Sequence, residues 1–136
     1  MASIFSKIIA GQIPSYKVAE SDLFYAFLDI NPLKKGHTLV IPKLEIDYIF
    51  DIEDVILAEM MIFAKKVAIS IEKVIPCKRV AMTVIGLEVP HAHIHLIPLD
   101  EINDINFSKP KLHLESLEFE NISKAILMNF NQLAWW

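Results

Sequence analysis

Residues Val89–Pro98 read VPHAHIHLIP, so three histidines occupy every second position of an otherwise apolar stretch. Side chains of a β-strand alternate between the two faces of a sheet, which predicts that His91, His93 and His95 share one face. The other face is apolar and is made of the intervening side chains, Ala92, Ile94 and Leu96. The stretch therefore predicts a strand that buries one face in a core and presents a row of imidazoles on the other.

The composition is that of a folded protein with one domain. The 136 residues are 54% hydrophobic and 22% charged, and a chain of this length can bury a core. The formal net charge is -4, and Lys and Arg form no long run. Extended nucleic acid is not an expected partner, because proteins that neutralise phosphates usually carry a basic patch.

The sequence gives no sign of an oxidising compartment or of a membrane. Cys77 is the only cysteine, so no intramolecular disulfide can form. The first residues, MASIFSKIIAGQIP, are typical of a short amphipathic helix instead of a signal peptide. The most apolar region, VILAEMMIFAKK, contains Glu59 and is too short to span a bilayer. We expect a cytoplasmic protein without membrane association.

Hydrophobic periodicity predicts a helix near the N-terminus, followed by three strands. Ser3 is the expected helix cap and Gly11 marks the helix end, with an apolar face made of Ile4, Phe5, Ile8 and Ile9. The strands are expected at residues 16–21, 23–30 and 37–42, where the sequence reads YKVAES, LFYAFLDI and HTLVIP.

A long helix, two strands and a terminal helix are expected in the rest of the chain. The long helix covers residues 51–74, with periodic positions at Val55, Ala58, Met61, Ile62, Lys65 and Ile69. The strands cover 79–86 and 91–98 around a short turn at Gly86, and the last helix covers 116–133. Short connections between consecutive strands favour an α+β fold with an antiparallel meander of about five strands.

The histidine row has three chemical interpretations. Histidines at a sheet edge can simply bond backbone carbonyls, although three of the five histidines within five residues argue against a purely structural role. Alternating histidines can chelate zinc or copper, with a fourth ligand from Cys77, His37 or Asp100. Imidazole is also a good nucleophile toward phosphorus. A row then supplies the attacking nitrogen, donors for the phosphate oxygens and an acid for the leaving group.

The residues HAHIHLI match the alternation His-φ-His-φ-His-φ-φ and resemble the motif of the histidine triad (HIT) family of nucleotide hydrolases and transferases. Two further blocks, IFSKIIAGQIPSYKV and YAFLDINPLKKGHTLVIPK, are similar to those of the Hint-like branch and occur in the same order. Together the blocks cover most of residues 4–98, whereas the tail 99–136 carries little of the resemblance. The resemblance implies a single HIT domain over residues 1–136.

The resemblance also implies a role for each histidine. His93, in the middle of the row, would attack the α-phosphorus and form a nucleotidyl-histidine intermediate. The backbone carbonyl of His91 would hold the second ring nitrogen of His93, and His95 would contact the phosphate. His37, in GHTLVIPK, would take the position of the family's fourth, supporting histidine.

A nucleoside site follows from the same resemblance. Asp29, in FLDINP, would accept hydrogen bonds from the ribose hydroxyls. The purine would be held between apolar side chains, namely Ile30, Phe27, Ile4, Phe5 and Ile8. Without the resemblance these residues would be read as an ordinary turn and as core, although an apolar slot with one carboxylate suits a nucleoside.

No cofactor or metal is expected, because imidazoles can stabilise the charge that magnesium stabilises in other phosphoryl-transfer enzymes. The family is generally homodimeric, with one sheet continued across two protomers. The long helix, with its apolar stretch VILAEMMIFA, would lie near that interface.

The sequence departs from the family pattern in three places. The family usually has Gly-Gln-(Ser/Thr)-Val before the triad, whereas this chain has GLEV with Glu88 in the hydroxyl position. Glu88 is either a general acid with a raised pKa or a side chain turned to solvent. The loop before the triad is also shorter, and Glu45 replaces the family's histidine after VIPK.

The expected function is cleavage of purine nucleoside phosphoramidates, or of related nucleoside 5′-monophosphate conjugates, at the α-phosphorus. The alternatives are a dinucleoside polyphosphate hydrolase, a non-catalytic nucleotide-binding protein and a metal-binding protein. The residues leave open the base preference, the part played by the tail, and whether Trp135 and Trp136 reach the site.

Overall fold

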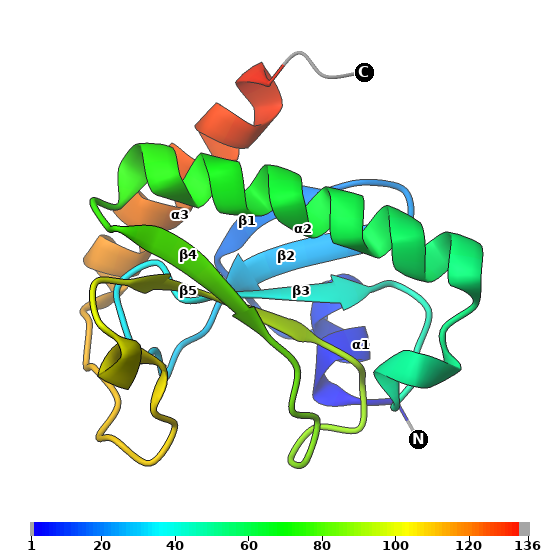
Figure 1. The fold of residues 1–136 in the computed structure, drawn as a ribbon. Helices are drawn as coiled ribbons and strands as arrows, with labels where there is room; N and C mark the ends of the chain where they lie inside the picture. The colour runs from blue at the N-terminus through cyan, green and yellow to red at the C-terminus, as the bar shows by residue number, and fades with distance from the viewer. Residues whose placement is uncertain (1, 134–136) are drawn as a thin grey trace.

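The computed structural model describes residues 2–133. It consists of an antiparallel sheet, whose strands carry apolar side chains, and of helices that pack on the sheet (Figure 1). Trp135 and Trp136 lie outside the described residues. The elements in chain order are α1 (Ile4–Ile9), β1 (Lys17–Glu20), β2 (Phe24–Leu28), β3 (Thr38–Pro42), the 3-10 helix η1 (Ile49–Asp51), α2 (Asp54–Val74), β4 (Arg79–Thr83), β5 (Ile94–Leu99), the 3-10 helix η2 (Ile102–Ile105) and α3 (Ser116–Gln132).

The five strands lie in the order β1-β2-β3-β5-β4, and every neighbouring pair is antiparallel. The predicted α+β fold with a five-stranded antiparallel sheet, a long helix and a terminal helix is confirmed. The order differs from a plain meander at one point, because β5 lies between β3 and β4. His95 consequently pairs with Leu39 on one side and with Thr83 on the other.

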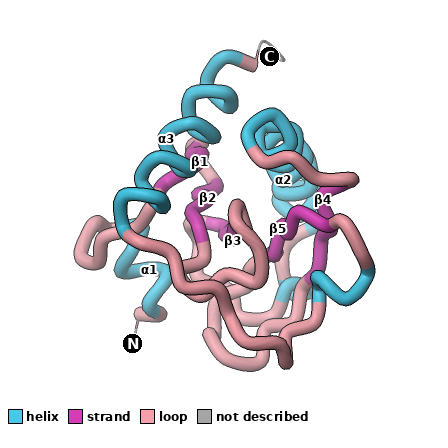
Figure 2. The backbone as a smooth tube through the Cα atoms, turned by 90° about the vertical axis from the view of Figure 1, so that its left-hand side faces the viewer, coloured by secondary structure: helices cyan, strands magenta, loops and turns pink. Residues whose placement is uncertain are grey.

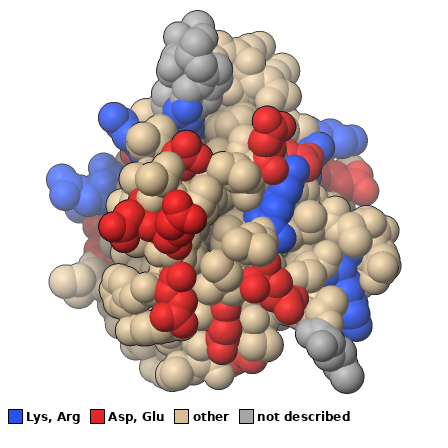
Figure 3. Space-filling view, turned by 90° about the vertical axis from the view of Figure 1, so that its right-hand side faces the viewer, with Lys and Arg blue, Asp and Glu red and all other residues tan. Residues whose placement is uncertain are grey.

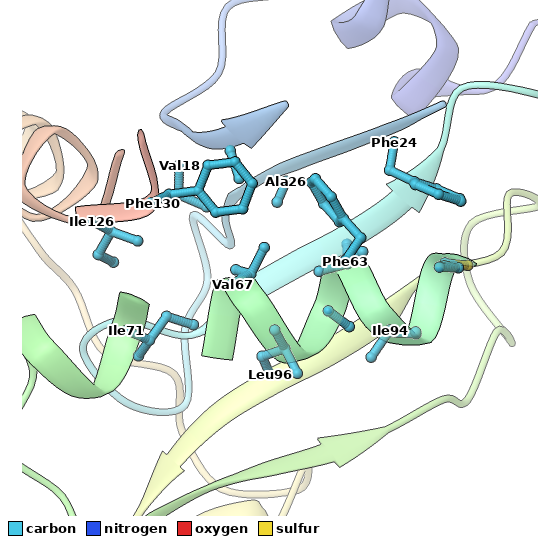
Figure 4. Packing of buried hydrophobic residues seen from close by; sticks show 14 of the residues in the cluster. Val18, Phe24, Ala26, Phe63, Val67, Ile71, Ile94, Leu96, Ile126 and Phe130 are labelled. Carbon is cyan, nitrogen blue, oxygen red and sulfur yellow. The ribbon is translucent and has the colours of Figure 1, made fainter. Parts of the chain in front are cut away.

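The two faces of the sheet are covered differently, as Figure 2 shows. The face under α2 and α3 carries the larger core, in which Phe63 and Phe130 of the helices pack near Ala26 and Ile94 of the strands (Figure 4). On the opposite face α1 packs Phe5, Ile8 and Ile9 against a smaller cluster, which consists of Tyr25, Phe27, Leu39 and Ile41. The sheet therefore separates a large apolar core from a face that is shared by α1 and the histidines.

The histidine segment follows the predicted alternation but is only partly a strand. Ala92, Ile94 and Leu96 lie in the larger core, as expected. However, β5 begins at Ile94, and residues 84–93 form a long connection instead of the predicted short turn. The N–H of Ala92 donates to the carbonyl of Ile46, beyond the end of β3, so this part of the segment leaves the regular ladder.

The buried face of the long helix is not the one marked by its periodic positions. Helix α2 begins at Asp54, after η1, and its buried residues are Met60, Phe63, Ala64, Val67, Ser70 and Ile71. Of the predicted positions, Val55, Ala58, Met61, Ile62 and Lys65 are exposed. The helix is apolar on most of its circumference, so periodicity alone did not identify the side that packs on the sheet.

One face of the molecule shows the excess of acidic residues that the net charge of -4 reflects. Acidic side chains gather on the face shown in Figure 3, where basic side chains are fewer. Among the residues described, no helix is both long and apolar enough to cross a bilayer.

Candidate active site

Four histidines from two segments meet on the face of the sheet that carries α1. The side chains of His37, His91, His93 and His95 are 1%, 0%, 6% and 8% exposed. The ring centroids of His93 and His95 lie 5.0 Å apart, and those of His37 and His95 lie 5.2 Å apart. Phe5 of α1 packs its ring edge-to-face on His91 and His93. The fold therefore brings together the row and the distant His37, as predicted.

Hydrogen bonds fix which nitrogen of His37 carries its proton. The N–H of Leu33 donates to Nδ1 of His37 over 3.0 Å, so Nδ1 holds a lone pair and the proton of the neutral ring is on Nε2. Nε2 lies 2.9 Å from Nδ1 of His95 and donates to it. The neutral His95 ring then carries its own proton on Nε2, the nitrogen not bonded to His37.

The same reasoning applies to His93. Its Nδ1 lies 2.8 Å from the backbone carbonyl of His91, and a carbonyl can only accept. Nδ1 therefore carries the proton, and Nε2 keeps its lone pair. A neutral imidazole in this tautomer can attack an electrophile or accept a proton.

His91 has partners for both of its ring nitrogens within the protein. Nε2 lies 2.8 Å from the carbonyl of Pro42, to which it must donate. Nδ1 lies 2.8 Å from Oγ of Ser3, so this nitrogen accepts from the Ser3 hydroxyl. With both nitrogens bonded and the ring fully buried, the His91 side chain is a structural support of the row.

Burial keeps His37, His91 and His95 neutral. Together with the smaller effect of a neighbouring histidine, burial lowers the pKa of His37 to about 3 and the pKa of His95 to about 4. Burial also lowers the pKa of His91. Neutral rings are what the hydrogen-bond pattern requires, because His37, His91 and His95 each accept a bond at one nitrogen.

Asp29 follows β2 and lies beside His37. One carboxylate oxygen accepts the N–H of Asn31 over 2.8 Å, and the other lies 3.6 Å from Nε2 of His37. Burial raises the pKa of this carboxyl group, while the charge of Lys111 lowers it. Glu88 also raises the pKa of Asp29, but it is the weakest of these causes.

The structure places the predicted purine-binding residues unequally. Phe5 and Phe27 are buried and pack edge-to-face with ring centroids 5.5 Å apart, and Ile8 packs against the same cluster. Ile4 and Ile30 are exposed. Ile4 was predicted to be part of the apolar face of α1, but it does not belong to the cluster that packs on the sheet. An apolar wall therefore lies beside the histidine row, and the contacts of these five residues with a purine stay a prediction.

Glu88 lies in the connection between β4 and β5 and is exposed. A carboxylic acid stays protonated near neutral pH mainly when it is buried or close to another negative charge. The exposed position agrees better with the solvent-facing alternative, and the general-acid role of Glu88 stays a prediction.

Three groups that can ligate a metal lie close together, namely Asp29, His37 and His95. One ligand atom from each lies within 4.8 Å of the others. Nε2 of His37 faces this group and carries a proton, whereas a ligating nitrogen needs a free lone pair. A metal here would thus cost the hydrogen bond from Leu33. The group contains neither of the other predicted ligands, Cys77 and Asp100.

The tail contributes a residue that the sequence did not indicate. The ring of Phe107 lies 5.0 Å from that of His95 and 6.2 Å from that of His37, centroid to centroid. The tail is held there by the N–H of Leu112, which donates to the carbonyl of Pro32 in the FLDINP segment. Because the tail carries no recognisable motif, only the three-dimensional structure reveals this contact.

Ser3, Ser6 and Glu45 are also part of the surroundings of the row. The sequence identified Ser3 only as a helix cap, and it does cap α1 by accepting the N–H of Ser6 over 3.0 Å. Its second bond, to His91, joins residues 88 positions apart and leaves no local signal in the sequence.

Comparisons with known proteins agree on one family. The model of the HIT domain matches residues 10–102. An uncharacterized HIT-like protein of Borreliella burgdorferi is 37% identical over 134 residues, covering 93% of this chain and 96% of the relative. The adenosine 5′-monophosphoramidase of Saccharomyces cerevisiae is 41% identical over 100 residues, covering 71% of this chain and 62% of the yeast protein.

A solved structure supports the same fold. The crystal structure of a hypothetical histidine triad nucleotide-binding protein from Sulfolobus tokodaii superposes with a TM-score of 0.82 at 29% identity. The superposition covers 93% of this chain and 91% of the Sulfolobus chain.

Proposed function

This chain belongs to the HIT domain family, and from that premise we propose that it is a nucleotide hydrolase or transferase. Its substrates would be purine nucleoside phosphoramidates or related nucleoside 5′-monophosphate conjugates, cleaved at the α-phosphorus. The observation that carries the proposal is the free lone pair on Nε2 of His93, whose other nitrogen is held by the His91 carbonyl. The similarity to the yeast adenosine 5′-monophosphoramidase supports the substrate class.

In the first step, Nε2 of His93 would attack the α-phosphorus while the bond from phosphorus to the leaving nitrogen breaks. The electron pair goes to the leaving amine, which takes up a proton from solvent. In the second step, water attacks the phosphorus and gives up a proton to solvent, while the bond to His93 breaks and its electron pair returns to Nε2. The nucleoside monophosphate is then released. The proton on Nε2 of His95 would donate to a phosphate oxygen, and His37 would keep it on that nitrogen.

The nucleoside would lie along the wall formed by α1 and β2. Asp29 would accept hydrogen bonds from the ribose hydroxyls, and Phe5, Phe27 and Ile8 would contact the purine. Ile4 and Ile30, which are exposed, would close the slot from outside. The carboxylate and the apolar wall are the two elements that nucleoside binding needs.

We also propose a homodimer, formed by a second copy of the chain. Strand β4 is an edge of the sheet, so its outer backbone groups have no strand partner among the residues described. Beside this edge, exposed apolar side chains line a hollow of about 560 Å³, among them Tyr48, Phe50, Met61, Met82 and Ile85. The exposed side of α2 belongs to the same surface. Light scattering of the purified protein would give the mass of the assembly.

AMP release from adenosine 5′-phosphoramidate tests the proposed activity, with His93→Ala as the control. We expect turnover by the unaltered protein and a loss of kcat on the order of 10³-fold or more in the variant. Turnover that survives the substitution would disprove the role of His93. Faster turnover of diadenosine polyphosphates would assign the other substrate class.

A cytoplasmic location, suggested by the single cysteine, stays part of the proposal.

A further inference from the structure

The start of α1 is bonded directly to the histidine row, although Ser3 and His91 lie 88 positions apart in the sequence. The hydroxyl of Ser3 accepts the N–H of Ser6 and donates to Nδ1 of His91 over 2.8 Å. Ser3 is only 6% exposed, so water does not readily replace it. One hydroxyl thus caps the helix and completes the hydrogen bonds of His91.

Glu45 holds this hydroxyl group in place. One carboxylate oxygen, Oε1, accepts both the backbone N–H of Ser3 and, over 2.6 Å, the hydroxyl of Ser6. These hydrogen bonds, with that of Ser6 the largest cause, lower the pKa of Glu45 to about 2. The carboxylate is therefore ionised at neutral pH. Figure 1 shows α1 below β3, whose following connection carries Glu45.

The direction of each bond explains why Ser3 matters to His93. The Pro42 carbonyl accepts a hydrogen bond from Nε2–H of His91, which leaves Nδ1 of His91 as an acceptor that needs a donor. Without the Ser3 hydroxyl, the hydroxyl that remains beside this buried nitrogen is that of Ser6, which lies 3.5 Å away and donates to Glu45 over 2.6 Å instead. The nitrogen would therefore lose its short hydrogen bond. The His91 ring would then rotate or change tautomer, and its backbone carbonyl is the group that orients His93.

We propose that Ser3, Ser6 and Glu45 act as positioning residues for His93, working through His91. The inference rests on the proposed function for its effect on turnover, but its effect on the rings does not depend on any substrate. These three residues contact His91 or one another instead of the reacting nitrogen, so their removal lowers kcat and leaves KM nearly unchanged.

Substitutions of Ser3 separate the hydroxyl donor from the helix cap. Ser3→Gly removes the donor, but Gly at a helix cap costs only a few tenths of a kcal/mol compared with Ser. Ser3→Thr keeps both the donor and the cap. We expect kcat to fall about tenfold or more in Ser3→Gly and to stay within about twofold in Ser3→Thr, because small displacements of a reacting group are costly.

A matched control removes another serine hydroxyl from the same face of the sheet. Ser15 bonds the hydroxyl of Tyr25 over 2.6 Å and does not touch the row. Ser15→Ala is expected to leave kcat within about twofold, because it lies outside the hydrogen-bond network of His91. A loss of kcat in Ser15→Ala equal to that in Ser3→Gly would overturn the proposal.

Imidazole nitrogen NMR tests the inference without substrate. In the unaltered protein, we expect the proton of His91 on Nε2 and the proton of His93 on Nδ1. Ser3→Gly should change the His91 signals and leave those of His37 and His95 in place, whereas Ser3→Thr should change neither set. Unchanged His91 signals in Ser3→Gly would overturn the inference. Absent turnover in the unaltered protein, with these signals as expected, would count against the proposed function alone.

Discussion

The two ends of the histidine row differ in their hydrogen-bond partners. At one end, both ring nitrogens of His91 are bonded to the protein, one to Pro42 and one to Ser3. At the other end, His95 has one nitrogen bonded to His37 and a proton on the nitrogen that faces away from it. Identical side chains in a row therefore become different through their hydrogen-bond partners. The ring of His91 is fixed at both nitrogens, whereas His95 keeps an N–H that is not bonded to His37.

The electrostatic surroundings of the two ends differ in the same sense. At the His91 end, the Pro42 carbonyl and the Glu45 carboxylate both raise the pKa of His91 and partly oppose the effect of burial. At the His95 end, burial and the neighbouring His93 both lower the pKa, to about 4. The environment of His95 therefore suits a neutral ring, which carries one proton that it can donate and does not gain a second one.

The largest effect expected from breaking this comparison is that of His95→Ala. The variant removes the proton donor and leaves the His91 end intact, so kcat should fall about 10²-fold or more with little change in KM. Rates of AMP release at several phosphoramidate concentrations give both constants. The control is His113→Ala, which removes an exposed histidine from the tail. An equal loss of kcat in the two variants would show that His95 has no special role.

The next effect concerns stability against pH. In the unfolded chain His37 and His95 would titrate near pH 6.5, whereas in the folded protein their pKa values are about 3 and about 4. Between these values the unfolded chain binds protons that the folded protein excludes, so the free energy of unfolding falls as pH falls below about 6.5. Above that pH these groups contribute a constant amount.

The expected loss from His95 is on the order of 3 kcal/mol by about pH 4, since each pKa unit corresponds to about 1.4 kcal/mol. Urea unfolding followed at intervals from about pH 7.5 to pH 4.5 measures this dependence. The variant His95→Ala should show a shallower slope over the same range. A slope identical to that of the unaltered protein would mean that His95 titrates normally in the folded state.

The sequence predicted the elements better than their partners. The alternation around Ile94 correctly predicted that the histidines and the apolar residues lie on opposite faces. This could be predicted because the alternation of side chains in a strand depends only on neighbouring residues. The buried side of α2 does not follow from its periodicity, because the exposed residues Val55 and Met61 are as apolar as the residues that pack on the sheet. The choice between such sides depends on elements that come together only in the fold.

The candidate site likewise contains residues that the sequence predicted and partners that it did not. His91, His93 and His95 were visible as a motif, and His37 was found through the resemblance of its own sequence block. The partners of the row were not visible, because Ser3 and Phe107 reach it from segments that carry no pattern of their own for this purpose. Hydrogen-bond direction, which fixes the tautomers, follows only from the geometry of the assembled fold.

The smallest effect expected is that of Phe107→Ala at the His95 end. Phe107 packs its ring edge-to-face on His95 and covers part of it, without forming a hydrogen bond that fixes the ring. Its removal should hydrate His95 and move its pKa upward toward the ordinary value, because burial is the main cause of the low value. The acid limb of the kcat profile should shift to higher pH, and kcat should fall only about two- to fivefold near pH 7. Ile102→Ala, an exposed residue of the same tail, is the matched control. If the pH profile of kcat for Phe107→Ala superposed on that for Ile102→Ala, the sheet and His37 alone would account for the burial of the His95 ring.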